Sequence, residues 1–273
     1  MGLATVLGLK RQGFFIPYRY AEKIPQSEVH LNYSRIEQRL NDSQAIFENH
    51  ISFIKQYTDE LRNIGPDNPP QPRWNQNWFP ALDAAIAYTM VRKHAPKNII
   101  EVGSGHSTRF MARAVTDGLL DTKISAIDPV PRAVIDKLDI NIIKNTVQEV
   151  GLDMFDLLKP GDILFIDSSH ILMPGTDVDF LINRVLSRIP VGVIIHIHDI
   201  FLPDNYPQSW HWRGYNEQLA IAVLLQGDRF EILFSSYYVA TRMSQTLEGT
   251  LLFELDRPKE SFETSLWIRK LEN

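Results

Sequence analysis

The segment Asn98-Ile-Ile-Glu-Val-Gly-Ser-Gly-His-Ser-Thr108 decides the fold, because an apolar stretch runs into Glu-x-Gly-x-Gly and then into the start of a helix. This is the layout of a cofactor site at the first crossover of an α/β sheet. Gly103 and Gly105 allow a sharp turn and a close approach of a ligand, and Ser107 is predicted to cap a helix beginning near Thr108. An ordinary strand-to-helix turn is the alternative explanation of the motif taken alone.

The cofactor predicted at this turn has no phosphate groups. The third glycine of a dinucleotide fingerprint would fall at position 108, which is threonine, so the pyrophosphate cradle is incomplete. S-adenosylmethionine (SAM) has no phosphate, and the carboxylate of Glu101 suits its ammonium group. We therefore predict that SAM binds along Glu101, Gly103, Ser104, Gly105, Ser107 and Thr108.

The composition excludes several other classes of protein. The 273 residues include no cysteine, so disulfides, zinc-thiolate sites and thiol nucleophiles are absent. A net charge of −5 argues against a broad nucleic-acid surface and favours a small-molecule partner. Lys10 and Arg11 follow a short apolar run instead of preceding it, which is the wrong order for a signal peptide, and no apolar stretch approaches about 18 residues. We expect a cytoplasmic protein with no membrane partner.

A predicted helix precedes this α/β region. From Ser34 to Ile64 apolar residues recur at helical spacing, and the proline-rich segment 65–72 ends the pattern. We therefore expect an N-terminal helical extension with its linker over residues 1–73 and the main domain over 74–273. A lid and a homo-oligomer surface are two candidate roles for the helix, but packing against its own core is the favoured one.

The rest of the chain alternates strands with helices, which predicts an α/β, Rossmann-like, doubly wound sheet of seven mostly parallel strands. The predicted strands cover 97–102, 124–128, 140–147, 162–167, 191–198, 230–236 and 265–270. In such a sheet ligands bind at the carboxyl ends of the strands.

Polar residues stand at those strand ends. Asp128 follows Gly105 by 23 positions, which suits an acid that binds the ribose hydroxyls of a cofactor. Asp167 and His170 follow the fourth strand, and His198 and Asp199 close the fifth. Carboxylates combined with imidazoles suit a divalent cation, so Asp167, His198 and Asp199 are candidate ligands for Mg²⁺ or another divalent ion.

These motifs resemble those of class I SAM-dependent methyltransferases, especially a bacterial branch with Phe-Ile-Asp-Ser-Ser-His and His-Asp-Ile-Phe-Leu-Pro motifs. The two motifs stand here at 165–170 and 198–203, and the resemblance covers most of residues 74–270. A more distant similarity is to the sugar O-methyltransferases of the macrocin and mycinamicin type. That similarity implies Asp167 and Asp199 as metal ligands and His170 as general base, with His198 departing from the family's acidic pair.

The resemblance implies methyl transfer from SAM to an oxygen of a small hydroxylated acceptor such as a sugar, a phenol or a secondary metabolite. Residues after the fifth strand are predicted to contact that acceptor, namely Tyr206, Trp210, Trp212 and Arg213. Two alternatives stay open at this point. One is an NAD-dependent oxidoreductase on the same sheet, and the other is a non-catalytic SAM-binding or assembly protein.

Overall fold

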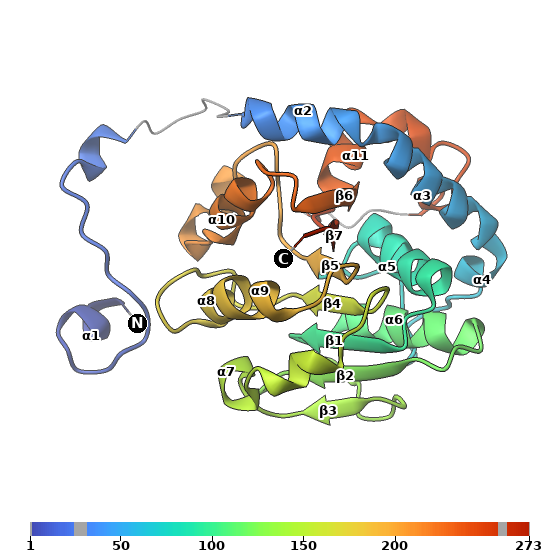
Figure 1. Ribbon diagram of the computed structural model, residues 1–273, viewed down its shortest axis with the longest axis horizontal. Coiled ribbons are helices and arrows are strands. Elements are labelled where there is room, and N and C mark those ends of the chain that lie inside the picture. The colour runs from blue at the N-terminus through green and yellow to red at the C-terminus, as the bar shows by residue number, and fades with distance from the viewer. Residues whose placement is uncertain (1, 25–31, 256–260, 273) are drawn as a thin grey trace. The chain divides into compact units, whose positions relative to one another are not determined.

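The computed structural model describes residues 2–24, 32–255 and 261–272 (Figure 1). The chain forms two compact units, Met1–Leu31 and Asn32–Asn273. The first contains the short helix α1 (Gly2–Val6) and the 3₁₀ turn η1 (Ala21–Lys23), neither of which buries a residue. The second contains the sheet and all the candidate site residues.

The sheet of the second unit has seven strands in the order β3-β2-β1-β4-β5-β7-β6 (Figure 1). The strands are β1 (Asn98–Val102), β2 (Lys123–Ile127), β3 (Asn141–Ile143), β4 (Ile163–Ile166), β5 (Ile194–Ile197), β6 (Phe230–Ser235) and β7 (Leu266–Lys270). β1 to β5 pair in parallel, and β7 is antiparallel to both of its neighbours. The predicted seven-stranded, mostly parallel sheet is therefore confirmed, although the third strand is shorter than predicted.

This strand order positions the site. The chain builds outward from β1 in one direction through β2 and β3, and in the other through β4 and β5. The switch in direction lies between β1 and β4, and ligands of doubly wound sheets bind outside the strand ends at such a point. The glycine turn after β1 and the Asp167 segment after β4 both lie there.

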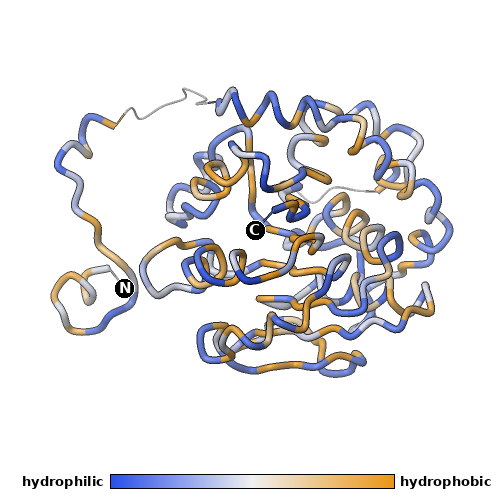
Figure 2. Tube along the Cα trace, in the orientation of Figure 1, coloured by the Kyte–Doolittle hydropathy of each residue, from blue (hydrophilic) through white to orange (hydrophobic). Residues whose placement is uncertain are grey.

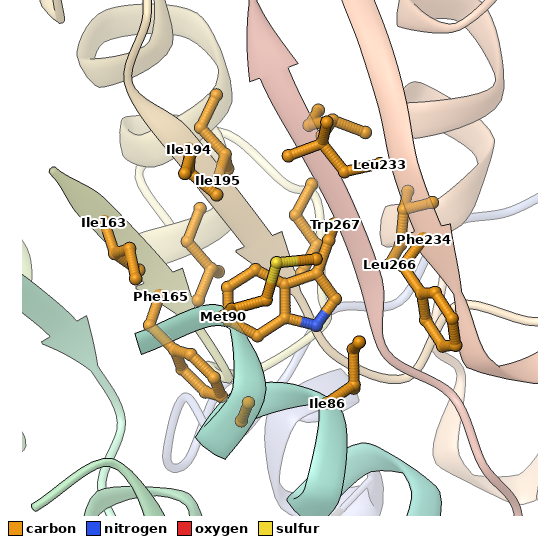
Figure 3. Close-up of a cluster of buried hydrophobic side chains, with 14 of the residues drawn as sticks. Ile86, Met90, Ile163, Phe165, Ile194, Ile195, Leu233, Phe234, Leu266 and Trp267 are labelled. Atoms are coloured by element: carbon orange, nitrogen blue, oxygen red, sulfur yellow. The ribbon is translucent and has the colours of Figure 1, made fainter. Parts of the chain in front are cut away.

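The central strands β4 and β5 are buried along their whole length because helices cover both faces of a parallel sheet. All four residues of β4 and all four of β5 are buried. Figure 3 shows Trp267 of β7 surrounded by side chains of β4, β5, β6 and helix α5 (Ala81–His94). Its indole is fully buried and packs against Phe165, with ring centroids 5.9 Å apart.

The helices that follow α5 alternate with the strands. They are α6 (His106–Asp117), α7 (Val147–Val150), α8 (Asp177–Phe180), the π-helical turn η3 (Leu181–Val185), α9 (Leu186–Arg188), α10 (Glu217–Leu224) and α11 (Ser236–Arg242). Four 3₁₀ turns complete the unit, η2 (Asp153–Leu157), η4 (Gln208–Arg213), η5 (Ser244–Leu247) and η6 (Leu251–Phe253).

The single long helix predicted over 34–64 is wrong. Three successive helices occupy the segment, α2 (Ser34–Asp42), α3 (Gln44–Gln56) and α4 (Thr58–Arg62). The breaks fall at Ser43 and Tyr57, whose ψ angles of 0° and 19° depart from helical values. The hydroxyl of Ser43 donates to the carbonyl of Arg39 at 2.9 Å, which is the kind of local bond that competes with a regular helix.

The predicted apolar face of this segment is nevertheless buried. Ile36, Leu40, Phe47, Ile51 and Ile54 are all inaccessible to solvent, and α3 packs against α5 and β6. Packing against the chain's own core is thus the observed role of this face. The boundary between the two compact units lies at 31/32, ahead of the proline-rich segment.

Hydrophobic and hydrophilic residues alternate along these helices, as Figure 2 shows. Within residues 2–24, 32–255 and 261–272, no helix has the length and apolar character needed to cross a membrane.

Candidate active site

The glycine turn after β1 touches the end of β4. Gly103 has a φ of +83°, and a Cβ at this position would lie 1.8 Å from the carbonyl oxygen of Asp167. No side chain can occupy that space. Gly105 has extended backbone, and a Cβ there would meet no atom within 4 Å, so its surroundings are open to a ligand. Gly103 therefore allows the turn to pack against Asp167, and Gly105 leaves space in which a ligand can approach the backbone.

Glu101 lies beneath this turn and not at its surface. Its two carboxylate oxygens accept hydrogen bonds of 2.6 Å from the hydroxyls of Ser107 and Thr108. Thr108 in turn accepts from the backbone N–H of Gly105 at 2.9 Å. Burial raises the pKa of Glu101 to about 8, although the two hydroxyl hydrogen bonds act to lower it. Glu101 does not line the cavity described below, so contact with a cofactor ammonium is not supported.

The prediction that Ser107 caps the following helix is wrong. Helix α6 begins at His106, directly after Gly105, and the hydroxyl of Ser107 is bonded to Glu101 instead. The first helical turn and the carboxylate beneath it thus form one hydrogen-bonded unit.

Asp128, after β2, fixes the other side of the turn. One carboxylate oxygen accepts from the backbone N–H and hydroxyl of Ser104 at 3.0 and 2.7 Å. The other accepts from the N–H of Val130 at 2.8 Å. Asp128 and Ser104 both face the cavity, which is the placement that a ribose-binding acid requires.

A cavity of about 1400 Å³ connects these elements. Its walls include the glycine turn, Asp128, the segment after β4 and the loop after β5. Among the predicted site residues, the cavity is lined by Gly103, Ser104, Gly105, Ser107, Asp128, Asp167, His170, His198, Asp199, Trp210, Trp212 and Arg213. The volume is ample for a cofactor and a second small molecule together.

Six titratable residues meet at the ends of β4 and β5, and we call them the strand-end cluster. They are Asp83, Asp167, His170, His198, Asp199 and Glu217. The imidazole of His170 lies between three carboxylates: its Nε2 is 3.4 Å from Asp167 Oδ1 and 3.2 Å from Asp199 Oδ2, and its Nδ1 is 2.9 Å from Glu217 Oε2. His170 and Asp199 both have positive φ, +60° and +57°, so backbone strain is concentrated at this point.

Asp83 of α5 orients the ring of His198 by contacting its Nε2 atom. The carboxylate of Asp83 accepts from the backbone N–H groups of Thr264 and Ser265, each at 2.9 Å, and lies 3.2 Å from His198 Nε2. The other ring nitrogen, Nδ1, faces Asp199 Oδ1 at 3.4 Å and Asp167 Oδ1 at 3.6 Å. Both histidines of the cluster are thus held at both ring nitrogens.

The carboxylates favour the charged form of both imidazoles. Burial lowers the pKa of His170, but Asp199, Asp167 and Glu217 outweigh it, and the pKa lies well above its ordinary value. Burial also lowers the pKa of His198, but Asp167 and Asp199 outweigh this effect, so the pKa of His198 is raised as well. For Asp167 burial acts to raise the pKa, and the two histidines reverse that effect and lower it. The carboxylates around both rings therefore stabilise the protonated form of each imidazole.

His196, two residues before His198, belongs to the core. It is fully buried, stacks on Phe165 with centroids 3.6 Å apart, and shares a 2.9 Å hydrogen bond with the hydroxyl of Ser265. Burial holds its pKa well below the ordinary value, so the ring is neutral.

The predicted metal ligands do not have a coordinating arrangement. Within the part of the chain that the structure describes, no group of three His, Asp or Glu residues is placed to hold a metal ion. The imidazole of His170 contacts Asp167 and Asp199 from between them, which is where a cation bound by both would lie.

Of the predicted acceptor residues, Tyr206 does not line the main cavity. It lines a separate, smaller cavity of about 250 Å³, and its hydroxyl accepts from the N–H of Gln218 at 3.4 Å. Tyr215 and Phe262 line the main cavity in its place, with the Tyr215 ring centroid 4.7 Å from that of His170.

Sequence reasoning gave no role to Asp83, Tyr215, Phe262 or the Glu217 carboxylate. Only Glu217 had a sequence signal, because Asn216-Glu217 is a further short match to the methyltransferase branch whose motifs stand at 165–170 and 198–203. The other three come from distant segments and follow no motif.

Residues 100–200, from β1 through β5, match a family model described as a methyltransferase domain. No curated protein matches the chain significantly.

Similar solved structures include a methyltransferase of Podospora anserina bound to S-adenosylhomocysteine (SAH), with 15% identity, 95% of this chain and 100% of that chain covered, and a TM-score of 0.45. A second is the O-methyltransferase TomG of Streptomyces achromogenes, with 11% identity, 89% of this chain and 99% of that chain covered, and a TM-score of 0.43. A third is an O-methyltransferase of Bacillus cereus, with 12% identity, 88% of this chain and 99% of that chain covered, and a TM-score of 0.43. The family-model match spans the part of the chain that contains the glycine turn, Asp128, Asp167, His170 and Asp199.

Proposed function

We propose that this protein transfers the methyl group of SAM to a hydroxyl oxygen of a small acceptor, with His170 as the general base. The observation that carries the proposal is the placement of His170 in the cavity that the glycine turn and Asp128 also line. A buried imidazole at the end of β4, beside the cofactor turn, can reach an acceptor bound next to the transferable methyl.

Glu217 sets the direction of proton transfer. The carboxylate at 2.9 Å from Nδ1 keeps a proton on that nitrogen, so in the neutral ring Nε2 is the atom that accepts the acceptor's proton. Because the pKa of His170 is raised, the neutral, basic form of the ring is reached at a higher pH than for an ordinary histidine. Asp167 and Asp199 then stabilise the imidazolium, because both lie within 3.4 Å of Nε2. General base catalysis of this kind contributes roughly 10²- to 10⁴-fold in rate.

The reaction balances without a further reagent. The bound cofactor supplies an electrophilic methyl on a sulfonium, the acceptor oxygen forms the new O–C bond as the S–C bond breaks, and the proton of the hydroxyl passes to His170. The remaining contribution of the protein is alignment of the two molecules, which can amount to about 7 to 11 kcal/mol. Ser104, Asp128 and the open space at Gly105 are the features proposed to hold the cofactor.

A metal ion is not part of this proposal, because the imidazole of His170 contacts both Asp167 and Asp199 from the position that a shared cation would take. We expect methyl transfer to persist in the presence of EDTA. Loss of turnover in EDTA that added Mg²⁺ or Mn²⁺ restores would return those carboxylates to the role of metal ligands.

The two alternatives have less support. The methyltransferase-domain match and Thr108 both argue against an NAD-dependent oxidoreductase. The hydrogen-bonded cluster argues against a non-catalytic binding protein. Burying three carboxylates and two imidazoles is costly, and a protein without catalytic activity would have no use for them.

Calorimetry with SAM and NAD, followed by mass spectrometry of a panel of hydroxylated acceptors incubated with SAM, tests the proposal. SAM binding with methylated product is the expected result. Binding of NAD alone, or SAM binding without product from any acceptor, would contradict it.

A further inference from the structure

Arg213 lies in an aromatic setting on the wall of the main cavity. Its guanidinium carbon is 3.9 Å from the ring centroid of Trp210, 5.4 Å from that of Tyr215 and 5.6 Å from that of Trp212. Its Nη1 donates to the hydroxyl of Tyr215 at 3.3 Å. Stacked aromatic faces remove water from a guanidinium but accept none of its in-plane hydrogen bonds.

Among the residues that the structure describes, none forms a hydrogen bond with Nε or Nη2 of Arg213. Nε is buried and without a hydrogen-bond acceptor, and within residues 2–24, 32–255 and 261–272 Arg213 forms no salt bridge. A buried donor left unsatisfied destabilises a protein by roughly 1 to 3 kcal/mol, so such a group is kept where a ligand satisfies it. The two adjacent N–H groups form the fork that matches a carboxylate.

The other arginines of the cavity differ from Arg213. Arg73 pairs with Asp67, and Arg109 is buried with its Nε donating to the carbonyl of Val134 at 3.2 Å. Arg132 is exposed and lies over Trp78, with 5.7 Å from its guanidinium carbon to the ring centroid. Arg213 alone among these four combines aromatic stacking, a buried Nε and the absence of any acidic or carbonyl partner.

Tyr215 connects this arginine to the proposed chemistry. Its ring contacts the guanidinium of Arg213 and also lies 4.7 Å from the His170 ring, centroid to centroid. Trp210 and Phe262 line the same part of the cavity, with ring centroids 5.9 Å apart. A molecule bound here meets aromatic faces along its length, the base near one end and the free guanidinium fork near the other.

We propose that the acceptor is a hydroxylated aromatic carboxylate, whose carboxylate pairs with the guanidinium of Arg213 while its hydroxyl faces His170. This assignment rests on the proposed methyl transfer for the role of the hydroxyl. Recognition of the carboxylate by Arg213 is a separate property that binding alone can measure.

The test compares dihydroxybenzoate with the matched neutral dihydroxybenzamide by calorimetry, in the presence of SAH. The native protein should bind the acid about tenfold more tightly than the amide, the equivalent of about 1.4 kcal/mol. Arg213→Met should reduce this preference to about one, and Arg213→Lys should keep part of it, since it retains the charge without the planar fork. Arg132→Met is the matched control, an arginine of the same cavity whose removal should leave the preference intact.

Each of three results would overturn the assignment: equal affinity for acid and amide in the native protein, binding of neither, or a preference that survives Arg213→Met. SAH affinity, measured first, should be the same in all variants. Absence of SAH binding and of methyl transfer would refute the proposed function instead, and a carboxylate preference that depends on Arg213 would stand without it.

Discussion

A Cβ on Gly103 would lie 1.8 Å from the carbonyl oxygen of Asp167, so the turn after β1 and the end of β4 meet at a position that only glycine can fill. The contact joins the predicted cofactor turn to the proposed base segment, because His170 follows Asp167 by three residues. The two halves of the site are therefore fixed relative to each other by backbone packing.

Gly103→Ala should unfold at a markedly lower temperature than the native protein. The added methyl collides with backbone and also meets a φ of +83°, so a loss of about 3 kcal/mol or more in the free energy of unfolding is expected.

Gly105→Ala is the matched control, because a Cβ there meets nothing within 4 Å. Its stability should change by less than about 1 kcal/mol, while its affinity for SAM should fall if the ligand approaches this backbone closely. Thermal denaturation and calorimetry check both variants, and equal stability of the two alanine variants would refute the packing argument.

Glu101→Gln should flatten the dependence of stability on pH. The pKa of Glu101 is raised from 4.5 to about 8, so in the pH interval between these values the folded protein holds a proton that the unfolded chain has released. The contribution of Glu101 to the free energy of unfolding is therefore fully present below pH 4.5, and it is lost as the pH rises through about 8.

Melting temperatures measured from about pH 5 to about pH 9 test this, with the native protein declining more steeply than the variant. Parallel curves would show that Glu101 keeps its charge when buried.

His170→Ala should lower kcat roughly 10²- to 10⁴-fold while leaving the affinity for SAM nearly unchanged. The expected loss follows from removal of the proton acceptor, since the side chains that face the predicted cofactor stay in place. Glu217→Gln is the partner experiment, because its amide keeps the shape of the group and removes the charge at Nδ1. It should lower kcat less than His170→Ala does, and native turnover in His170→Ala would remove this histidine from the mechanism.

Asp83→Ala should destabilise the protein by at least about 2 kcal/mol. The substitution leaves the backbone N–H groups of Thr264 and Ser265 buried without acceptors and also removes the partner of His198 Nε2. Asp121→Ala removes an exposed carboxylate paired only with Lys97 and should change stability by less than about 0.5 kcal/mol. Denaturant titration of both variants decides the matter, and similar midpoints would contradict the anchoring role of Asp83.

The sequence predicted the sheet well because its signal is local. Continuous apolar runs such as 163–166, separated by helical patterns, define buried parallel strands, and the rule that ligands bind at the carboxyl strand ends brought Asp128, Asp167, His170 and Asp199 to one edge. Where local propensity was the only guide, the predicted helix boundaries were wrong. Ser43 and Tyr57 break the N-terminal helix through backbone angles that its apolar periodicity does not reveal.

The sequence by itself determined the fold class, the turn at 103–105 and most residues at the strand ends, since each depends on spacing along the chain. Tertiary structure alone decided that Glu101 lies beneath the turn, that Asp83 and Glu217 hold the two histidines, and that Tyr215 replaces Tyr206 beside the base. The reason is physical: the partner of a buried charge is chosen by which segments pack together, and Asp83 reaches His198 across 115 positions of sequence. Such pairing follows from the packed core and has no local signature.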